Sequence, residues 1–217
     1  MDLVKLQKNW WRNGFELGLK QNIYIIDNFI SPVEAKQAVE SFDGSGDVNG
    51  WAADGGHVTS REIDETNPIF GVVKYRLIPM ASAWAGRRLT TYLNPYLRKY
   101  PNGSWLGSHC DSEGEDDFGP LPESSFNVEY SQCPMLIEYA ANIYLNDDYE
   151  GGELVFNNLR HSIKPKSGQL ILFPSGIEYK HEVSQISSGD RYSAVAFLTT
   201  EKLAILHSKI QQKSNNL

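Results

Sequence analysis

The stretch that decides the fold runs from Ala140 to Thr200 and reads AANIYLNDDYEGGELVFNNLRHSIKPKSGQLILFPSGIEYKHEVSQISSGDRYSAVAFLTT. Short runs of β-branched and aromatic residues alternate there with turns built from Gly, Pro, Asp and Asn. Short strands at this spacing are typical of an antiparallel sandwich or jelly roll. His181 and Arg191 lie at strand positions in the stretch. We therefore expect a mainly β fold whose strands carry functional side chains.

The N-terminal part of the chain is predicted to add helices to this fold. The run from Asn22 to Phe29 predicts a strand, and Ser31–Glu34 has the residues of a capping box at a helix start. Helical spacing between Leu77 and Leu97 predicts one or two helices that pack on the sheet. The Gly- and Asp-rich stretch 43–56 predicts a long loop. The expected fold class is mainly β with flanking helices.

One domain is expected for the whole chain, because its 217 residues show no internal repeat and no linker. Within this single domain, 1–217, residues 22–100 are predicted to form an N-terminal strand and supporting helices. Residues 104–200 are predicted to form the jelly-roll core, and residues 201–217 a C-terminal helix or tail.

Composition excludes several classes of function. Hydrophobic residues make up 41% of the chain and charged residues 22%, which is typical of a globular protein. A net charge of −7 argues against a nucleic-acid partner. We find no apolar run of membrane-spanning length and no signal-peptide pattern, so we expect a cytoplasmic protein with no membrane partner. Two cysteines, Cys110 and Cys133, make no disulfide framework, which fits a reducing compartment. The sequence does not give the oligomeric state.

A metal site is suggested by two histidines and an aspartate. His109 and Asp111 are two residues apart in a predicted strand, so both side chains point to one side. His181, on a later strand, is the best-placed third ligand. Two imidazoles and one carboxylate leave other metal positions open, as in non-haem Fe(II) oxygenases and unlike closed structural zinc sites. Either histidine alone would more often be a hydrogen-bonded residue of a sheet, so the prediction depends on the combination.

Arg191 strengthens this combination. It lies ten positions after His181 across a tight turn, so an adjacent antiparallel strand would bring it near the metal. Strand parity puts Ser193 on the same face as Arg191. A buried guanidinium requires an anionic partner, and its planar shape suits a carboxylate. An ordinary surface pairing with Asp190 or Glu153 stays open from the residues alone.

Five segments carry a resemblance to a known family. They are IDNFISPVEA at 26–35, YPNG at 100–103, DDYEGGELVF at 147–156, PKSGQLILFPS at 165–175 and HEVSQISSGDRYS at 181–193. On these segments the chain resembles Fe(II)- and 2-oxoglutarate-dependent oxygenases of the prolyl 4-hydroxylase-like group, and within it the bacterial and phage PKHD-type members. The resemblance covers most of the chain from Tyr24 to Thr200 and implies the double-stranded β-helix, a jelly roll.

The resemblance also implies roles for individual residues. The residues that match the iron ligands, and hence the catalytic centre, are His109, Asp111 and His181. The residues that match a cosubstrate pocket are Arg191, for the distal carboxylate of 2-oxoglutarate, with Ser193, Tyr144 and Tyr100. Prolyl 4-hydroxylases proper usually carry Lys where Arg191 stands, and the acidic segment 112–125 is unusually long. That segment is either a lid beside the site or a solvated loop.

The activity implied is that of a dioxygenase that hydroxylates an unactivated carbon, such as a prolyl residue in a peptide or protein, with release of succinate and CO2. Its cofactors would be Fe(II) and 2-oxoglutarate, with ascorbate as an optional reductant. The partner would be a peptide, protein or small-molecule substrate, and Trp51, Arg61 and Trp105 are candidates for lining the substrate side. Two alternatives stay open: a cupin-like metal enzyme that does not use 2-oxoglutarate, and a non-catalytic β-sandwich binding module.

Overall fold

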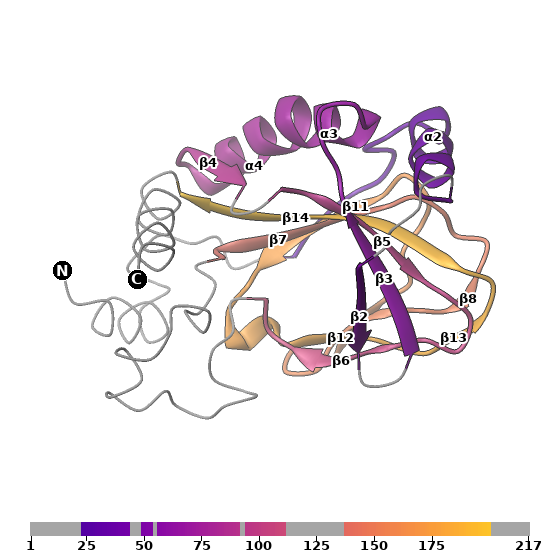
Figure 1. Ribbon diagram of the computed structural model, residues 1–217. Helices are drawn as coiled ribbons and strands as arrows, with labels where there is room; N and C mark the ends of the chain where they lie inside the picture. Colours follow the sequence, from indigo (N-terminus) through magenta and orange to yellow (C-terminus); the bar gives the residue numbers. More distant parts are fainter. Residues whose placement is uncertain (1–22, 44–48, 54–55, 92–93, 112–136, 201–217) are drawn as a thin grey trace, which may run out of the picture.

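Two β-sheets pack face to face in the structure, a computed structural model that describes residues 23–43, 49–53, 56–91, 94–111 and 137–200 (Figure 1). The larger sheet has the strand order β1-β11-β7-β14-β5-β3-β2, and β4 pairs with β14 beside this path. Its strands are β1 (Tyr24–Ile26), β2 (Asn49–Ala53), β3 (Gly56–Glu62), β4 (Leu89–Thr91), β5 (Tyr96–Tyr100), β7 (Tyr139–Tyr144), β11 (Leu170–Pro174) and β14 (Arg191–Thr200).

The smaller sheet has the order β10-β9-β12-β6, and β13 pairs with β8 in a separate two-stranded sheet. These strands are β6 (Leu106–His109), β8 (Glu150–Gly151), β9 (Leu154–Phe156), β10 (His161–Ile163), β12 (His181–Val183) and β13 (Ile186–Ser188). Apolar side chains of β7, β11 and β14 meet those of β9 and β10 in one buried cluster, which is the layer between the two sheets.

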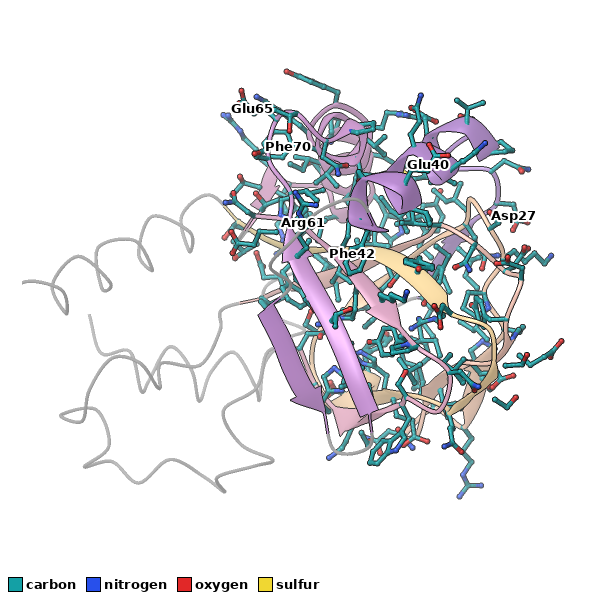
Figure 2. The ribbon with its side chains drawn as sticks, turned by 45° about the vertical axis from the view of Figure 1, so that its right-hand side comes forward. Asp27, Glu40, Phe42, Arg61, Glu65 and Phe70 are labelled. Atoms are coloured by element: carbon teal, nitrogen blue, oxygen red, sulfur yellow. The ribbon has the colours of Figure 1, made fainter. Side chains whose placement is uncertain are left out.

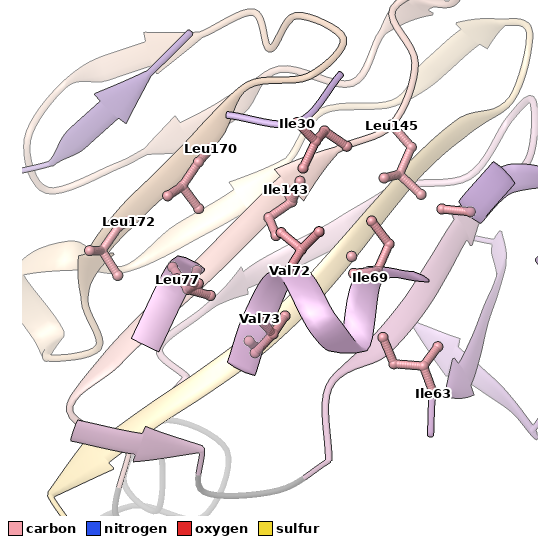
Figure 3. Close-up of a cluster of buried hydrophobic side chains, with 14 of the residues drawn as sticks. Ile30, Ile63, Ile69, Val72, Val73, Leu77, Ile143, Leu145, Leu170 and Leu172 are labelled. Atoms are coloured by element: carbon pink, nitrogen blue, oxygen red, sulfur yellow. The ribbon is translucent and has the colours of Figure 1, made fainter. Parts of the chain in front are cut away.

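Helices cover the other face of the larger sheet (Figure 1). They are α2 (Pro32–Asp43), α3 (Pro68–Val72) and α4 (Ile78–Ala85), with a π-helical turn (Val73–Leu77) between the last two. The predicted capping box opens α2, because the backbone N–H of Ser31 donates to Glu34 Oε2 at 2.8 Å and the N–H of Glu34 donates to Ser31 Oγ at 3.3 Å. Val72, Val73 and Leu77 pack over the sheet (Figure 3).

Strand β14 separates two buried layers. Ala194, Ala196 and Leu198 point to the helices, whereas Val195 and Phe197 point to the smaller sheet. Both faces of the strand are covered, so its sequence reads as a nearly continuous apolar run. Arg191 and Ser193 have the same parity as Val195 and Phe197. Their side chains therefore face the space between the two sheets.

Some expected elements differ in the structure. Stretch 43–56, predicted as a loop, contains β2, and the helical region ends at Ala85 instead of reaching Leu97. Gly86 ends α4 with φ 69°, a left-handed conformation that glycine adopts without steric cost. Only Tyr24–Ile26 of the first predicted strand is extended in β pairing.

A more consequential correction concerns the strand that carries Arg191. The segment after His181 forms β12 and β13, and β13 pairs with β8 and not with β14. Arg191 therefore does not lie on a strand adjacent to that of His181. It faces the smaller sheet from the larger one. Segments 112–125 and 201–217 lie outside the described residues. In the described part of the chain, no helix has both the length and the apolar character needed to span a bilayer.

Candidate active site

The three predicted ligands meet at one end of the smaller sheet. His109 ends β6, Asp111 follows that strand, and His181 begins β12, where it is the register partner of His109. Nε2 of His109 lies 3.5 Å from Asp111 Oδ1, and Nε2 of His181 lies 3.6 Å from Asp111 Oδ2. One ligand atom from each residue falls within 4.8 Å of the others. Antiparallel pairing thus brings together residues more than seventy positions apart in the chain.

Backbone carbonyls orient both imidazoles. Nδ1 of His109 lies 2.8 Å from the carbonyl oxygen of Gly107, and Nδ1 of His181 lies 3.0 Å from that of Tyr179. A carbonyl can only accept, so each Nδ1 carries the hydrogen and each Nε2 keeps its lone pair. This is the tautomer of a metal-ligating histidine whose other nitrogen is held by a hydrogen bond.

The charge states of His181 and Asp111 also suit a cation. Burial lowers the pKa of His181 to about 4, so that imidazole is neutral near pH 7. Burial raises the pKa of Asp111, but the neighbouring His181, His109 and Arg98 outweigh it and hold the pKa below its usual value. Burial lowers the pKa of His109. The hydrogen bond to Asp111 and the negative charge of that carboxylate raise it, and the net shift of the pKa is upward.

An unsatisfied atom completes the fit to a metal. Asp111 Oδ2 is buried, and no hydrogen-bond partner for it exists among the described residues. A buried carboxylate oxygen without a partner is costly in a folded protein, and a metal ion removes that cost. Two imidazole nitrogens and one carboxylate suit Fe(II) with open positions.

Arg191 supplies the second half of the site from the larger sheet. Its side chain is 2% exposed, and its guanidinium carbon lies 4.7 Å from the ring centre of Tyr100 and 4.9 Å from that of Tyr144. Tyr100 is its register partner on β5, and Tyr144 is the register partner of Ser193 on β7. Cross-strand pairing therefore gathers all four predicted cosubstrate residues around one guanidinium.

Several buried polar atoms around Arg191 are not hydrogen-bonded within the described part of the chain. Five of them have no hydrogen-bond partner in the described part of the chain: Arg191 Nε, Arg191 Nη1, Ser193 Oγ, Tyr144 OH and Tyr149 OH. Burial raises the pKa of Tyr144 to about 12, so its hydroxyl keeps its hydrogen and can donate. Convergent donors around a cation form a binding site for an anion such as a carboxylate.

The acidic neighbours considered as partners of Arg191 are engaged elsewhere. Asp190 Oδ2 lies 2.9 Å from Lys99 Nζ, and Glu153 accepts a hydrogen bond from the Ser184 hydroxyl. The described residues thus offer Arg191 no carboxylate, and the guanidinium is available to an external one.

A glycine makes room for the Arg191 side chain. Gly152 has φ 68°, and a Cβ at this position would lie 2.4 Å from Ile186 Cδ1 and 3.1 Å from Arg191 Cδ. It would also lie 2.9 Å from Tyr149 Cε2. Any larger residue would displace the wall against which Arg191 packs.

One pocket joins the two halves of the site. Its lining includes the three predicted ligands, Arg191 and Tyr100, and also Arg98, which the sequence analysis did not single out. Nη1 of Arg98 donates to the Tyr100 hydroxyl at 3.1 Å, and Nη2 donates to the Tyr96 hydroxyl at 2.9 Å. The alternation Tyr96, Arg98, Tyr100 in one strand was the sequence signal for it. Tyr149, which follows Asp147-Asp148 in a resembling segment, was also missed.

Two of the three substrate-side candidates, Arg61 and Trp105, do not line the pocket. Arg61 lies on β3, and its Nη1 donates to the backbone oxygen of Ser41 at 2.9 Å, at the end of α2 (Figure 2). It is the register partner of Leu97, whose side chain belongs to the helix-side core. Trp105 precedes β6, is half-buried and does not line the pocket. Trp51 lies in β2, and its side chain is outside the described part of the structure.

Comparisons with known proteins agree with this geometry. The family model described as the 2OG-Fe(II) oxygenase superfamily matches residues 95–199, which include the triad and Arg191. A PKHD-type hydroxylase of Shewanella baltica is 25% identical over 183 residues, or 80% of this chain and 76% of that protein. Prolyl 3-hydroxylase 2 of Rattus norvegicus is 39% identical over 71 residues, 30% of this chain. The match spans only 10% of that longer protein.

A solved structure supports the fold. The prolyl hydroxylase of Trichoplax adhaerens, in complex with a peptide fragment of the hypoxia inducible factor oxygen degradation domain, aligns with a TM-score of 0.64 at 18% identity. The alignment covers 95% of this chain and 97% of that one. The likeness confirms the predicted fold. The comparisons favour an Fe(II)- and 2-oxoglutarate-dependent oxygenase over the cupin-like and binding-module alternatives, and ascorbate stays a prediction. These similarities support the predicted family, the prolyl 4-hydroxylase-like group of the 2OG-Fe(II) oxygenases.

Proposed function

We propose that the chain, as one domain over residues 1–217, is a dioxygenase that hydroxylates an unactivated carbon and that His109, Asp111 and His181 hold its Fe(II). The observation that carries this proposal is the presence, in one pocket, of a two-histidine, one-carboxylate triad and a buried arginine that has no acidic partner among the described residues. A metal alone would explain the triad. The arginine calls for an anionic ligand in addition.

In this proposal the distal carboxylate of 2-oxoglutarate binds to Arg191. The hydroxyls of Ser193, Tyr144 and Tyr149 donate to the same carboxylate, since each is buried and lacks a partner in the described chain. The Tyr100 ring packs on the guanidinium and fixes its plane. Charge-assisted hydrogen bonds from a fixed guanidinium orient the cosubstrate as well as binding it.

When bound, iron and 2-oxoglutarate supply the oxidation, in which dioxygen converts 2-oxoglutarate to succinate and CO2 and places one oxygen atom in a C–H bond of the substrate. The chain's own tasks are to bind, to orient and to exclude water. Leu106, Leu154, Val183 and Val195 line the pocket between the triad and Arg191. These apolar walls keep solvent away from the reacting groups.

The substrate we propose is a prolyl residue in a peptide or protein. This is supported by the names of the similar proteins, a PKHD-type hydroxylase, a prolyl 3-hydroxylase and a prolyl hydroxylase in complex with a peptide fragment. Trp51 and Trp105 remain candidates for the substrate side, whereas the position of Arg61 on the helix side does not favour it.

Succinate formation tests the activity. The full chain is incubated with Fe(II), 2-oxoglutarate and a panel of proline-containing peptides, and succinate and the +16 mass of the peptide are measured. We expect both products to require iron and to be lost in His109→Ala. Arg191→Ala separates the oxygenase from a metal enzyme of another kind, because only the oxygenase loses 2-oxoglutarate binding. Absence of metal binding together with absence of succinate would contradict the proposal.

A further inference from the structure

The pocket contains a second arginine that the cosubstrate does not explain. Arg98 lines the pocket together with the triad and Arg191. Its Nε is buried and has no hydrogen-bond partner among the described residues. No carboxylate of the described chain lies in ion-pair contact with it. Among the described residues, Arg98 is therefore a cation without an ion-paired carboxylate.

Formal charges show why this matters. Under the proposed function, Fe(II) and the Asp111 carboxylate together carry one positive charge, and Arg191 carries another. The two carboxylates of 2-oxoglutarate compensate these two charges. The charge of Arg98 then stays uncompensated, and an unpaired charge in a water-excluding pocket is unfavourable.

The tyrosines around Arg98 do not supply that missing charge. The hydroxyls of Tyr96 and Tyr100 accept its hydrogen bonds, and the guanidinium carbon lies 4.9 Å from the ring centre of Tyr96. Burial raises the pKa of Tyr96 well above its usual value, so this hydroxyl is neutral. The tyrosines fix the guanidinium in place and leave its charge available.

The strand register shows which face of the larger sheet carries the Arg98 side chain and which residues lie beside it. Arg98 is the partner of Ser193 on one side and of Ser60 on the other, and directly opposite residues share a face of the sheet. One row therefore crosses four strands: Tyr144 on β7, Ser193 on β14, Arg98 on β5 and Ser60 on β3. The first two are proposed to bind the cosubstrate. Arg98 and Ser60 continue the row away from them, toward β2 at the edge of the sheet.

Ser60 provides a second donor at this position. Its Oγ is buried and, like Arg98 Nε, finds no partner in the described part of the chain. A guanidinium nitrogen and a hydroxyl on neighbouring strands form the same kind of donor pair that Arg191 and Ser193 form on β14. A carboxylate is the anion that suits such a pair.

We propose that Arg98, assisted by Ser60, binds a carboxylate of the substrate and so selects a substrate with an acidic group close to the carbon that is hydroxylated. The proposal rests on the proposed function, because the charge balance assumes bound iron and 2-oxoglutarate. In a peptide, this group would be an Asp or Glu side chain or a terminal carboxylate next to the target residue.

Binding measurements on the full chain test this without turnover. Mn(II) replaces Fe(II), and calorimetry gives the Kd of 2-oxoglutarate for the wild type, Arg98→Gln, Ser60→Ala and the control Lys99→Gln, whose cation pairs with Asp190. With 2-oxoglutarate saturating, N-acetylglycine and its neutral amide are then titrated as probes. We expect the wild type to bind the acid at least tenfold more tightly than the amide.

The variants decide the assignment. We expect Arg98→Gln to abolish the preference for the acid while the Kd of 2-oxoglutarate stays within twofold, and Ser60→Ala to reduce it in part. A wild type without a preference for the acid overturns the proposal, and so does an Arg98→Gln variant that keeps it. A tenfold loss of 2-oxoglutarate binding in Arg98→Gln also overturns it, because Arg98 would then serve the cosubstrate.

Two further outcomes are distinguishable from these. If Arg98→Gln does not fold, Arg98→Lys is measured instead, because lysine keeps the charge but lacks the planar donor arrangement. We expect the preference of Arg98→Lys for the acid over the amide to be at least threefold lower than that of the wild type. An unchanged preference overturns the proposal. If wild-type protein with Mn(II) does not bind 2-oxoglutarate at all, the proposed function itself has failed at the first titration.

Discussion

Arg191 and Tyr100 are register partners on β14 and β5, and the guanidinium carbon of Arg191 lies 4.7 Å from the centre of the Tyr100 ring. The guanidinium carbon of Arg98 lies 5.9 Å from the same ring. One tyrosine thus contacts two cations, and the negative face of an aromatic ring stabilises positive charge beside it. This arrangement lets two arginines share a buried pocket.

Replacing the Tyr144 hydroxyl should separate ligand binding from stability. In Tyr144→Phe we expect the Kd of 2-oxoglutarate to rise roughly 10- to 100-fold, because a hydrogen bond to a charged group contributes about 1.5–3 kcal/mol. The free energy of unfolding without ligand should not fall, since the hydroxyl has no described partner to lose. Calorimetry and urea unfolding measure the two quantities, and a loss of stability with unchanged affinity would refute this role.

Two glycines with nearly the same backbone conformation provide a matched test of the space beside Arg191. Gly152 has φ 68° and a crowded Cβ position, whereas Gly86 has φ 69° and nothing within 4 Å. Gly86→Ala should cost about 1–2 kcal/mol for the left-handed backbone alone. Gly152→Ala should cost a further 1–3 kcal/mol, roughly, for overpacking, and should also weaken 2-oxoglutarate binding. Equal effects of the two substitutions on stability and affinity would argue against steric support of Arg191.

Metal binding should stabilise the fold through the triad. Mn(II) at 100 times its Kd should raise the free energy of unfolding by about 2.7 kcal/mol. His181→Ala should abolish this increase, because it removes one of three ligands. His161→Ala is the control, since His161 is exposed on β10 and lies outside the pocket. Thermal unfolding with and without Mn(II) makes the comparison, and equal Mn(II)-induced shifts in the two variants would exclude His181 as a ligand.

Arg61 is expected to matter for stability and not for binding. Its guanidinium donates to the end of α2, so Arg61→Ala should lower the free energy of unfolding by about 1 kcal/mol. The Kd of 2-oxoglutarate and the acid preference of the pocket should stay unchanged. A changed peptide Km with normal stability would restore Arg61 to the substrate side.

The residues that the structure brings together were easier to predict from the sequence than the strand pairing that brings them together. Strand parity correctly placed Ser193 with Arg191, because alternation is a local property that a single strand determines. Pairing between distant strands is not local. The turn before Arg191 suggested a hairpin with the preceding segment, but β13 finds its partner in β8 and Arg191 faces His181 from the opposite sheet.

Elements near Gly-rich stretches were also hard to predict. β2 lies between Asp- and Gly-rich residues, and it pairs only with β3 at the edge of the sheet, so pairing rather than propensity makes it a strand. The helix expected to reach Leu97 ends at Gly86, where a left-handed residue is needed. The strand that carries Arg98 was missed because helical spacing was predicted as far as Leu97 and a turn from Tyr100. Without that strand, the sequence did not indicate that Tyr96, Arg98 and Tyr100 share one face.

The placement of Arg191 and the triad on opposing sheets has a consequence for cosubstrate choice. Facing sheets lie about 10 Å apart, and that separation determines the length of a dicarboxylate that can reach both ends at once. If 2-oxoglutarate spans the triad and Arg191 as proposed, then oxaloacetate, one methylene shorter, and 2-oxoadipate, one methylene longer, should bind less tightly. Phe156 and Phe173, whose rings pack 5.0 Å apart in the buried layer between the sheets, help to hold the two sheets at this separation.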